Sequence, residues 1–153
     1  MMHRWAALLI VLALSALATT SAAAQGTPPP SRERAPGFEL SQNFPNPFNP
    51  ETRIPFTLGN PSQCEQPGRL YRVTLRVYNV LAQPVAIPIL QGEGAPPEMG
   101  GRPLSNLQLP CGQYTAYWNG HFMNTTREVP SGIYIYQIEV DGQKLAKKMI
   151  VTK

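Results

Sequence analysis

Residues 71–78 read Tyr-Arg-Val-Thr-Leu-Arg-Val-Tyr, the clearest alternation of apolar and polar side chains in the chain. A period of two residues indicates a β-strand with one buried face and one face in water. β-branched and aromatic residues, which favour strands, fill most of the apolar positions. The sequence therefore predicts a strand here, in a sheet that packs one face against a core.

Similar segments lie on both sides of this strand, separated by turn residues: Ile54–Leu58, Val85–Ile89, Tyr114–Trp118, Ile133–Val140 and Leu145–Thr152. Asp141-Gly142 predicts a tight hairpin between the last two, because both central residues of a primed turn adopt positive φ. About seven short strands predict an all-β, antiparallel two-sheet sandwich of immunoglobulin-like architecture. Pro55 and Pro88 lack an N–H donor, so we expect their strands at sheet edges.

The composition excludes several other classes of protein. The chain has 17 Pro and 12 Gly among 153 residues, and only 14% of its residues are charged. So many helix breakers exclude an all-helical protein or a coiled coil. The net charge of +4 is mild, and the basic residues do not gather with aromatic side chains as nucleic-acid binding requires. No nucleic-acid partner is expected.

The N-terminus predicts export. Arg4 precedes an apolar run from Ala6 to Ala18, and small residues follow as far as Ala24. This pattern is typical of a secretory signal peptide, here residues 1–24, with cleavage between Ala24 and Gln25. The alternative is a membrane anchor, but the apolar run is shorter than the about 20 residues that a spanning helix needs. We therefore expect a secreted protein with no transmembrane segment in the mature chain.

The mature chain divides into two parts by composition. Residues 25–37 contain Pro, Ser and Arg without periodicity, which predicts a flexible tether. Residues 38–153 contain all of the alternating segments and form the expected sandwich domain.

Two cysteines, Cys64 and Cys111, lie in loop-like contexts of the exported part. An even pair in an oxidising compartment predicts a disulfide, and closing a loop of this length is worth roughly 4 kcal/mol. The alternative is a nucleophilic or metal-binding thiol, which needs a neighbouring base, and His121 has no visible orienting partner. The disulfide would join the long connections 59–70 and 91–110 and hold the longer one in place.

No pattern of catalytic or metal-binding residues is present in the sequence. Asp141 is the only Asp and belongs to the predicted turn, and no Glu forms a motif-spaced pair with another carboxylate or a histidine. Zinc, calcium and phosphate-loop patterns are absent from the sequence. We expect a protein that is not an enzyme and that uses no cofactor.

Several blocks of the sequence resemble the C-terminal sorting domains used by type IX secretion, which are related to the immunoglobulin-like domain of flagellar hook-capping proteins. The opening block, residues 40–52, reads Leu-Ser-Gln-Asn-Phe-Pro-Asn-Pro-Phe-Asn-Pro-Glu-Thr. The others follow in the family's order, and the resemblance covers residues 38–153: Val73–Leu81, Trp118–Gly120, Val129–Tyr136 and Lys147–Lys153. The X-Pro steps of the opening block predict an extended, stiff ribbon whose Phe44 and Phe48 dock on the sandwich.

The resemblance implies a function in export and cell-surface attachment. It implies that the terminal strand carries the sorting signal, at Lys147, Lys148, Met149, Ile150, Val151 and Lys153. The implied partners are the outer-membrane export machinery and then surface lipopolysaccharide or another surface protein. The implied location is extracellular or on the outer surface of a bacterium with an outer membrane.

The chain also departs from the pattern of this family. Only residues 25–37 precede the domain, where the family carries its cargo, and the cysteine pair with its long connections is additional. Ala82 and Asn119 replace a common Gly and a common Asp. These departures favour an alternative, in which the domain itself is a disulfide-stabilised extracellular adhesive or structural subunit that binds a partner.

Overall fold

The computed structural model describes residues 37–60, 64–65, 67–92, 95–123 and 125–153. The predicted signal peptide, its cleavage site at Ala24-Gln25 and residues 25–36 of the predicted tether lie outside these ranges. Within the described ranges, no helix is long and apolar enough to cross a membrane.

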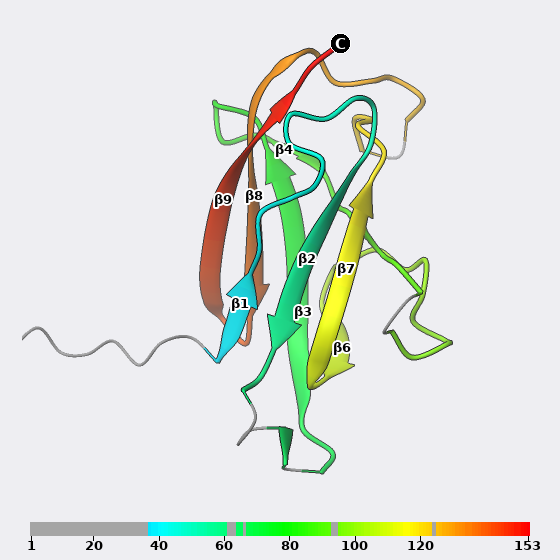
Figure 1. Ribbon diagram of the computed structural model, residues 1–153, viewed down its shortest axis with the longest axis vertical. Helices are drawn as coiled ribbons and strands as arrows, with labels where there is room; N and C mark the ends of the chain where they lie inside the picture. The colour runs from blue at the N-terminus through cyan, green and yellow to red at the C-terminus, as the bar shows by residue number, and fades with distance from the viewer. Residues whose placement is uncertain (1–36, 61–63, 66, 93–94, 124) are drawn as a thin grey trace, which may run out of the picture. The chain divides into compact units, whose positions relative to one another are not determined.

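Nine strands form two antiparallel sheets in the described part of the chain (Figure 1). The four-stranded sheet has the order β1-β2-β7-β5, and the five-stranded sheet has the order β4-β3-β8-β9 with β6 paired to β3. The strands are β1 (Phe38–Leu40), β2 (Thr52–Leu58), β3 (Leu70–Tyr78), β4 (Pro84–Ala86), β5 (Ile89–Leu90), β6 (Leu107–Pro110), β7 (Gly112–Trp118), β8 (Gly132–Val140) and β9 (Gln143–Val151). The all-β two-sheet architecture is confirmed, with nine strands rather than about seven.

The core lies between the two sheets, as the alternation predicts. Val73, Leu75 and Val77 of β3 are fully buried, and Ile54 and Phe56 supply the facing layer from β2. Burying a side chain of this size contributes about 1.5–3 kcal/mol, so the apolar rows provide the main stabilisation of the sandwich.

The segment Val85–Ile89, expected as one strand, is two strands in different sheets. Val85 belongs to β4, which pairs with β3, and Ile89 belongs to β5, which pairs with β7. Pro88 lies between them, where it has no N–H to give to a ladder, and its carbonyl accepts the N–H of Leu104. The chain therefore changes sheets at the proline, and both short strands are outer strands, as expected for Pro88.

The expectation that Pro55 marks a sheet edge is wrong, because β2 lies between β1 and β7. The Pro55 carbonyl accepts the N–H of Ser41 on the β1 side. The next contact on that side joins Phe44 to Arg53, so the chain bulges opposite the proline. The N–H that Pro55 lacks would therefore face a position beyond the end of β1, where the ladder between β1 and β2 has stopped.

The Asp141-Gly142 hairpin is confirmed. Both residues have positive φ, 50° and 88°, and they connect β8 directly to β9. Asp141 also binds β3, since its carboxylate accepts the N–H of Arg72 and its own N–H donates to the Arg72 carbonyl. The turn is thus fastened to the middle strand of its sheet.

Cys64 and Cys111 are joined in a disulfide with their Cα atoms 5.4 Å apart and 47 positions apart in sequence. The bond does not hold the longer connection as expected, because Cys111 follows β6 at the start of β7. Residues 95–106 are held instead by backbone hydrogen bonds, including those from Leu90 to Arg102 and from Leu75 to Leu104. The disulfide fastens only the connection between β2 and β3.

Replacing Cys64 and Cys111 together by serine should lower the free energy of unfolding by up to roughly 4 kcal/mol, through the entropy of the unfolded chain. Urea unfolding measures this loss. Limited digestion with a glutamate-specific protease then separates the two connections: cleavage after Glu65 should become faster, and cleavage after Glu98 should not change. Faster cleavage after Glu98 alone would contradict our assignment of the disulfide to the β2–β3 connection.

Candidate functional site

The terminal strand β9 is the last strand of its sheet and pairs only with β8 among the named strands. The predicted signal residues on it do not share one environment. The side chains of Met149 and Val151 are buried in the core, and Ile150 is half-buried on the opposite face. The side chains of Lys147 and Lys148 are exposed. In the folded domain, the accessible part of the predicted signal is therefore mainly cationic.

Two ion pairs form among the lysine and glutamate side chains near this strand. Lys153 forms an ion pair with Glu128, and Lys144 forms one with Glu139 at 3.5 Å. The hydrogen bond from Lys153 lowers the pKa of the exposed Glu128 carboxyl. Lys147 and Lys148 form no ion pair with any residue that the structure describes, so they remain available to an outside group.

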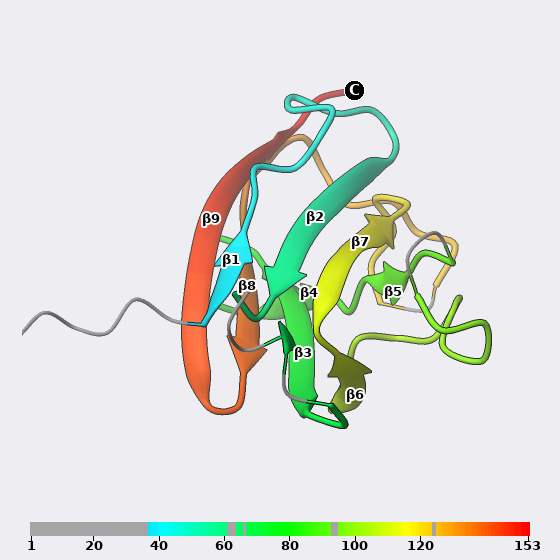
Figure 2. The same cartoon turned by 60° about the horizontal axis from the view of Figure 1, so that its bottom comes forward.

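The proline ribbon, residues 42–50, lies between β9 and β2 (Figures 1 and 2) and pairs with the edge of β9 that does not face β8. The Phe48 N–H donates to the Ile150 carbonyl at 3.0 Å, and the Thr152 N–H donates to the Phe48 carbonyl at 3.0 Å. Side chains add two contacts: Asn46 Oδ1 accepts the N–H of Ile150, and Gln42 Nε2 donates to the carbonyl of Lys148. The ribbon therefore pairs with backbone groups that an edge strand would otherwise expose.

A buried polar network holds the ribbon to both sheets. Asn43 is only 2% exposed, and its side-chain amide donates to Thr52 Oγ1 and to the Pro45 carbonyl, both at 3.0 Å. The Tyr136 hydroxyl accepts the N–H of Asn43 at 3.0 Å and donates to the carbonyl of Ser41 at 2.8 Å. Burial raises the pKa of Tyr136 to about 12, so the hydroxyl keeps its proton through the neutral range.

Phe48 docks in the core as expected, and Phe44 does not. Phe48 is 1% exposed and its ring centroid lies 5.5 Å from that of Trp118. Phe44 is 74% exposed, because its backbone pairs with Arg53 and its side chain is left on the outer side of the sheet. The expectation for Phe44 was wrong, since X-Pro geometry predicts an extended backbone but not which side faces the core.

The end of the ribbon needs a glycine opposite it. A Cβ placed on Gly120 would lie 2.3 Å from the Pro50 carbonyl oxygen, and Gly120 has a φ of 74°. Both the close approach and the positive φ favour glycine. A residue that contacts the ribbon therefore occurs in three of the blocks quoted above for the resemblance: 118–120, 129–136 and 147–153.

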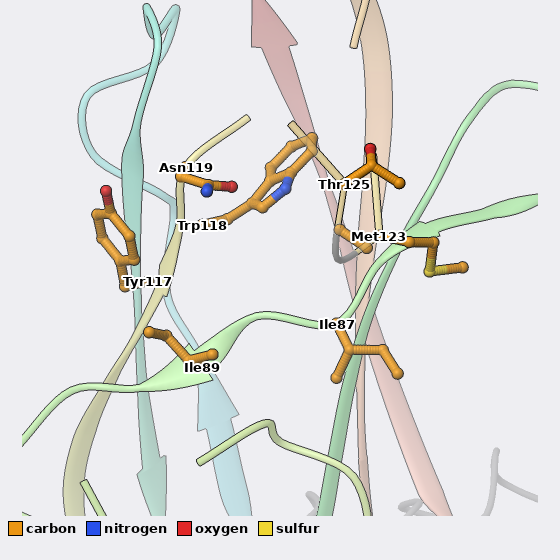
Figure 3. A pocket seen from close by; sticks show the side chains of 8 residues that line it. Ile87, Ile89, Tyr117, Trp118, Asn119, Met123 and Thr125 are labelled. Carbon is orange, nitrogen blue, oxygen red and sulfur yellow. The ribbon is translucent and has the colours of Figure 1, made fainter. Parts of the chain in front are cut away.

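A separate hollow lies at the end of β7, beside β5 (Figure 3). It encloses about 260 Å³, with Ile87 and Ile89 on one side and Trp118, Asn119 and Thr125 on the other. Tyr117 also lines it, and its hydroxyl donates to Glu51 at 2.6 Å, which raises the Tyr117 pKa. The mixed lining suits a small amphipathic group, but no nucleophile and base meet among its described lining residues.

No group of three or more His, Cys, Asp or Glu side chains that could hold a metal ion occurs among the residues that the structure describes. His121 donates its backbone N–H to Asn119 and shares a hydrogen bond through Nδ1 with the Asn119 amide. The histidine thus orders the loop after β7.

No protein-family model matches the chain, and no curated protein matches it. A solved structure that matches is the alkylpurine DNA glycosylase AlkC of Pseudomonas fluorescens, bound to DNA containing an abasic site analog. The match covers 76% of this chain and 31% of that chain, with 14% identity and a TM-score of 0.41.

The matched protein is an enzyme, which stands against the expectation that this protein is not one, and that expectation is withdrawn. With an identity of 14% and a TM-score of 0.41, the match is no evidence for an enzymatic activity of this chain. No glycosylase function and no DNA partner follow from the match.

Stability should fall as the pH rises from 10 to 12, because folded Tyr136 keeps a proton that the unfolded chain releases near its ordinary pKa of 10.0. Replacing Tyr136 by Phe should flatten this fall. The same change should cost about 1–3 kcal/mol at neutral pH, since Asn43 and Ser41 lose a buried hydrogen-bond partner. Urea unfolding across this pH range measures both effects, with Tyr78→Phe as the control. An unchanged alkaline slope in Tyr136→Phe would contradict the assignment.

Proposed function

We propose that residues 38–153 form a sorting and surface-attachment domain for an exported protein, recognised at its terminal strand by outer-membrane export machinery of the type IX class. The observation that carries the proposal is the junction of the ribbon with β9. The first and last blocks of the resemblance lie about a hundred positions apart in sequence, yet hydrogen bonds join them. A shared recognition surface accounts for this pairing of distant motifs.

Exposure and charge support the same surface. Lys147 and Lys148 are exposed on the strand and form no ion pair with a described residue, and Phe44 is exposed on the adjoining ribbon. Aromatic side chains are enriched at protein interfaces, and exposed cations steer a partner of opposite charge to such a surface. The structural role of Met149 and Val151 is to anchor the strand in the core.

The signal peptide and the disulfide support a second, related function. In this alternative, the mature chain is secreted and remains on the cell surface as an adhesive or structural subunit, with surface lipopolysaccharide or a surface protein as its partner. The disulfide between Cys64 and Cys111 favours it, because a domain that works outside the cell gains from this added stability.

Replacing Lys147 and Lys148 together by glutamine should reduce export without unfolding the domain. The test places a fluorescent reporter between residues 37 and 38, in a host with type IX secretion, and measures reporter on the cell surface. We expect a drop of about tenfold, equivalent to about 1.4 kcal/mol of recognition free energy. Lys144→Gln, on the same strand, is the matched control. Equal surface signal from the double variant and the control would refute the role of the two lysines.

The intact mass of the protein in its native host separates the two functions. A species from Gln25 to Lys153, with the mass deficit of one disulfide, is expected if the domain is retained as the working part. A species that lacks the C-terminal strands is expected if the domain is only an address. Protein found exclusively inside the cell would contradict both.

A further inference from the structure

The outer face of the five-stranded sheet carries a continuous apolar surface that the sorting proposal does not use. Val80 and Leu81, in the turn between β3 and β4, are 70% and 74% exposed, and Ile133 and Ile135 of β8 are 48% and 40% exposed. Val80 lines a hollow of about 370 Å³ with Tyr78 and Ile135, and it lines another with Ile133. We call these five side chains the apolar face.

The turn that carries Val80 and Leu81 lies beside β8 (Figure 1) and is ordered by its own hydrogen bonds. Asn79 Oδ1 accepts the N–H groups of Leu81 and Gln83, both at 3.0 Å, and the Asn79 amide donates to Gln83 Oε1 at 2.9 Å. Backbone hydrogen bonds join Asn79 to Gln83 and Ala82 to Asn79. The two apolar side chains are therefore presented to solvent by a defined turn.

Cations surround the apolar face, and the nearby carboxylates are already paired. Register places Lys148 beside Ile135, and Arg76 lies one row along from Tyr78 on the same side of the sheet. Arg127 lines the hollow that contains Val80 and Ile133. The neighbouring carboxylates, Glu128 and Glu139, bind Lys153 and Lys144 respectively. Among the described residues, the face is apolar at its centre and positive at its rim.

This charge pattern selects between the possible occupants. A symmetric contact with a second copy would bring the positive rims of the two copies together, which is unfavourable. An anionic lipid surface matches both parts: apolar side chains enter the acyl boundary, while Arg and Lys extend to the phosphates. Tyr78 adds an aromatic ring with a polar end, a residue type favoured at membrane interfaces.

We propose that this face docks the domain on an anionic lipid bilayer, with Val80 and Leu81 inserted and Arg76, Arg127 and Lys148 on the headgroup phosphates. The docking is peripheral and reversible, because the inserted apolar area is small. It does not depend on the sorting proposal, because Lys148 is the only docking residue that also belongs to the predicted sorting signal.

Flotation of the purified mature chain with lipid vesicles tests the proposal. We expect binding to vesicles of phosphatidylcholine mixed with phosphatidylglycerol, and weak binding to phosphatidylcholine alone. Val80→Ser with Leu81→Ser should lower the partition coefficient by about tenfold or more, as apolar transfer requires. Arg76→Gln with Lys148→Gln should lower it by about fivefold for each cation removed, and added salt should weaken the wild type similarly.

Matched controls show that the location of the residues matters. Phe44→Ser removes an apolar side chain that is 74% exposed on the ribbon, and Arg53→Gln with Arg102→Gln removes two exposed cations outside the five-stranded sheet. Both controls should bind like the wild type. Equal binding to neutral and anionic vesicles, or binding unaffected by either test variant, would overturn the proposal. A concentration-dependent dimer that Val80→Ser with Leu81→Ser abolishes, without vesicle binding, would assign the face to a second copy and overturn it as well.

Discussion

The pairing of the proline ribbon with the outer edge of β9 is the contact on which the rest of the domain depends. A terminal strand at a sheet edge exposes backbone donors and acceptors and frays easily. Here Phe48 supplies both a donor and an acceptor to that edge, and its ring enters the core beside Trp118. One residue therefore closes the sheet and fills the sandwich. Because the two partners come from opposite ends of the domain, closure requires almost the whole chain to be in place.

The proline content explains why tyrosine hydroxyls are so prominent in the polar network. Proline keeps its carbonyl acceptor and has no N–H, so Pro-rich connections contain more acceptors than donors. Side chains supply the missing donors: Tyr114 donates to the Pro110 carbonyl and Tyr134 to the Pro130 carbonyl, each at 2.9 Å. Tyr136 does the same for Ser41 in the ribbon. Each ring packs in the core while its hydroxyl donates a hydrogen bond to a loop carbonyl. A single tyrosine therefore both buries apolar surface and orders a loop.

Local sequence patterns predicted those features that depend on neighbouring residues. Alternation located β2, β3, β7, β8 and β9, and Asp141-Gly142 located the hairpin, because each signal lies within one element. The errors arose where a distant segment decides the outcome. Pro55 is tolerated in an inner strand because the chain that follows β1 bulges opposite it, and Phe44 is exposed because Arg53 pairs with its backbone. The junction of the ribbon with β9 was likewise outside the reach of local patterns, since nothing near Asn46 indicates Ile150 as its partner.

The terminal strand also explains how one short segment can serve two surfaces. Successive side chains of a strand point to opposite faces, so Lys147 and Lys148 lie on different sides of β9. Lys147 shares its side with the buried Met149 and is exposed because β9 is an outer strand, whereas Lys148 lies beside Ile135 on the apolar face. A partner that contacts only one side of β9 therefore binds only one of these two lysines. Recognition of the strand and docking of the apolar face therefore overlap at Lys148 alone, and the two proposals can be separated at Lys147 and at Arg76.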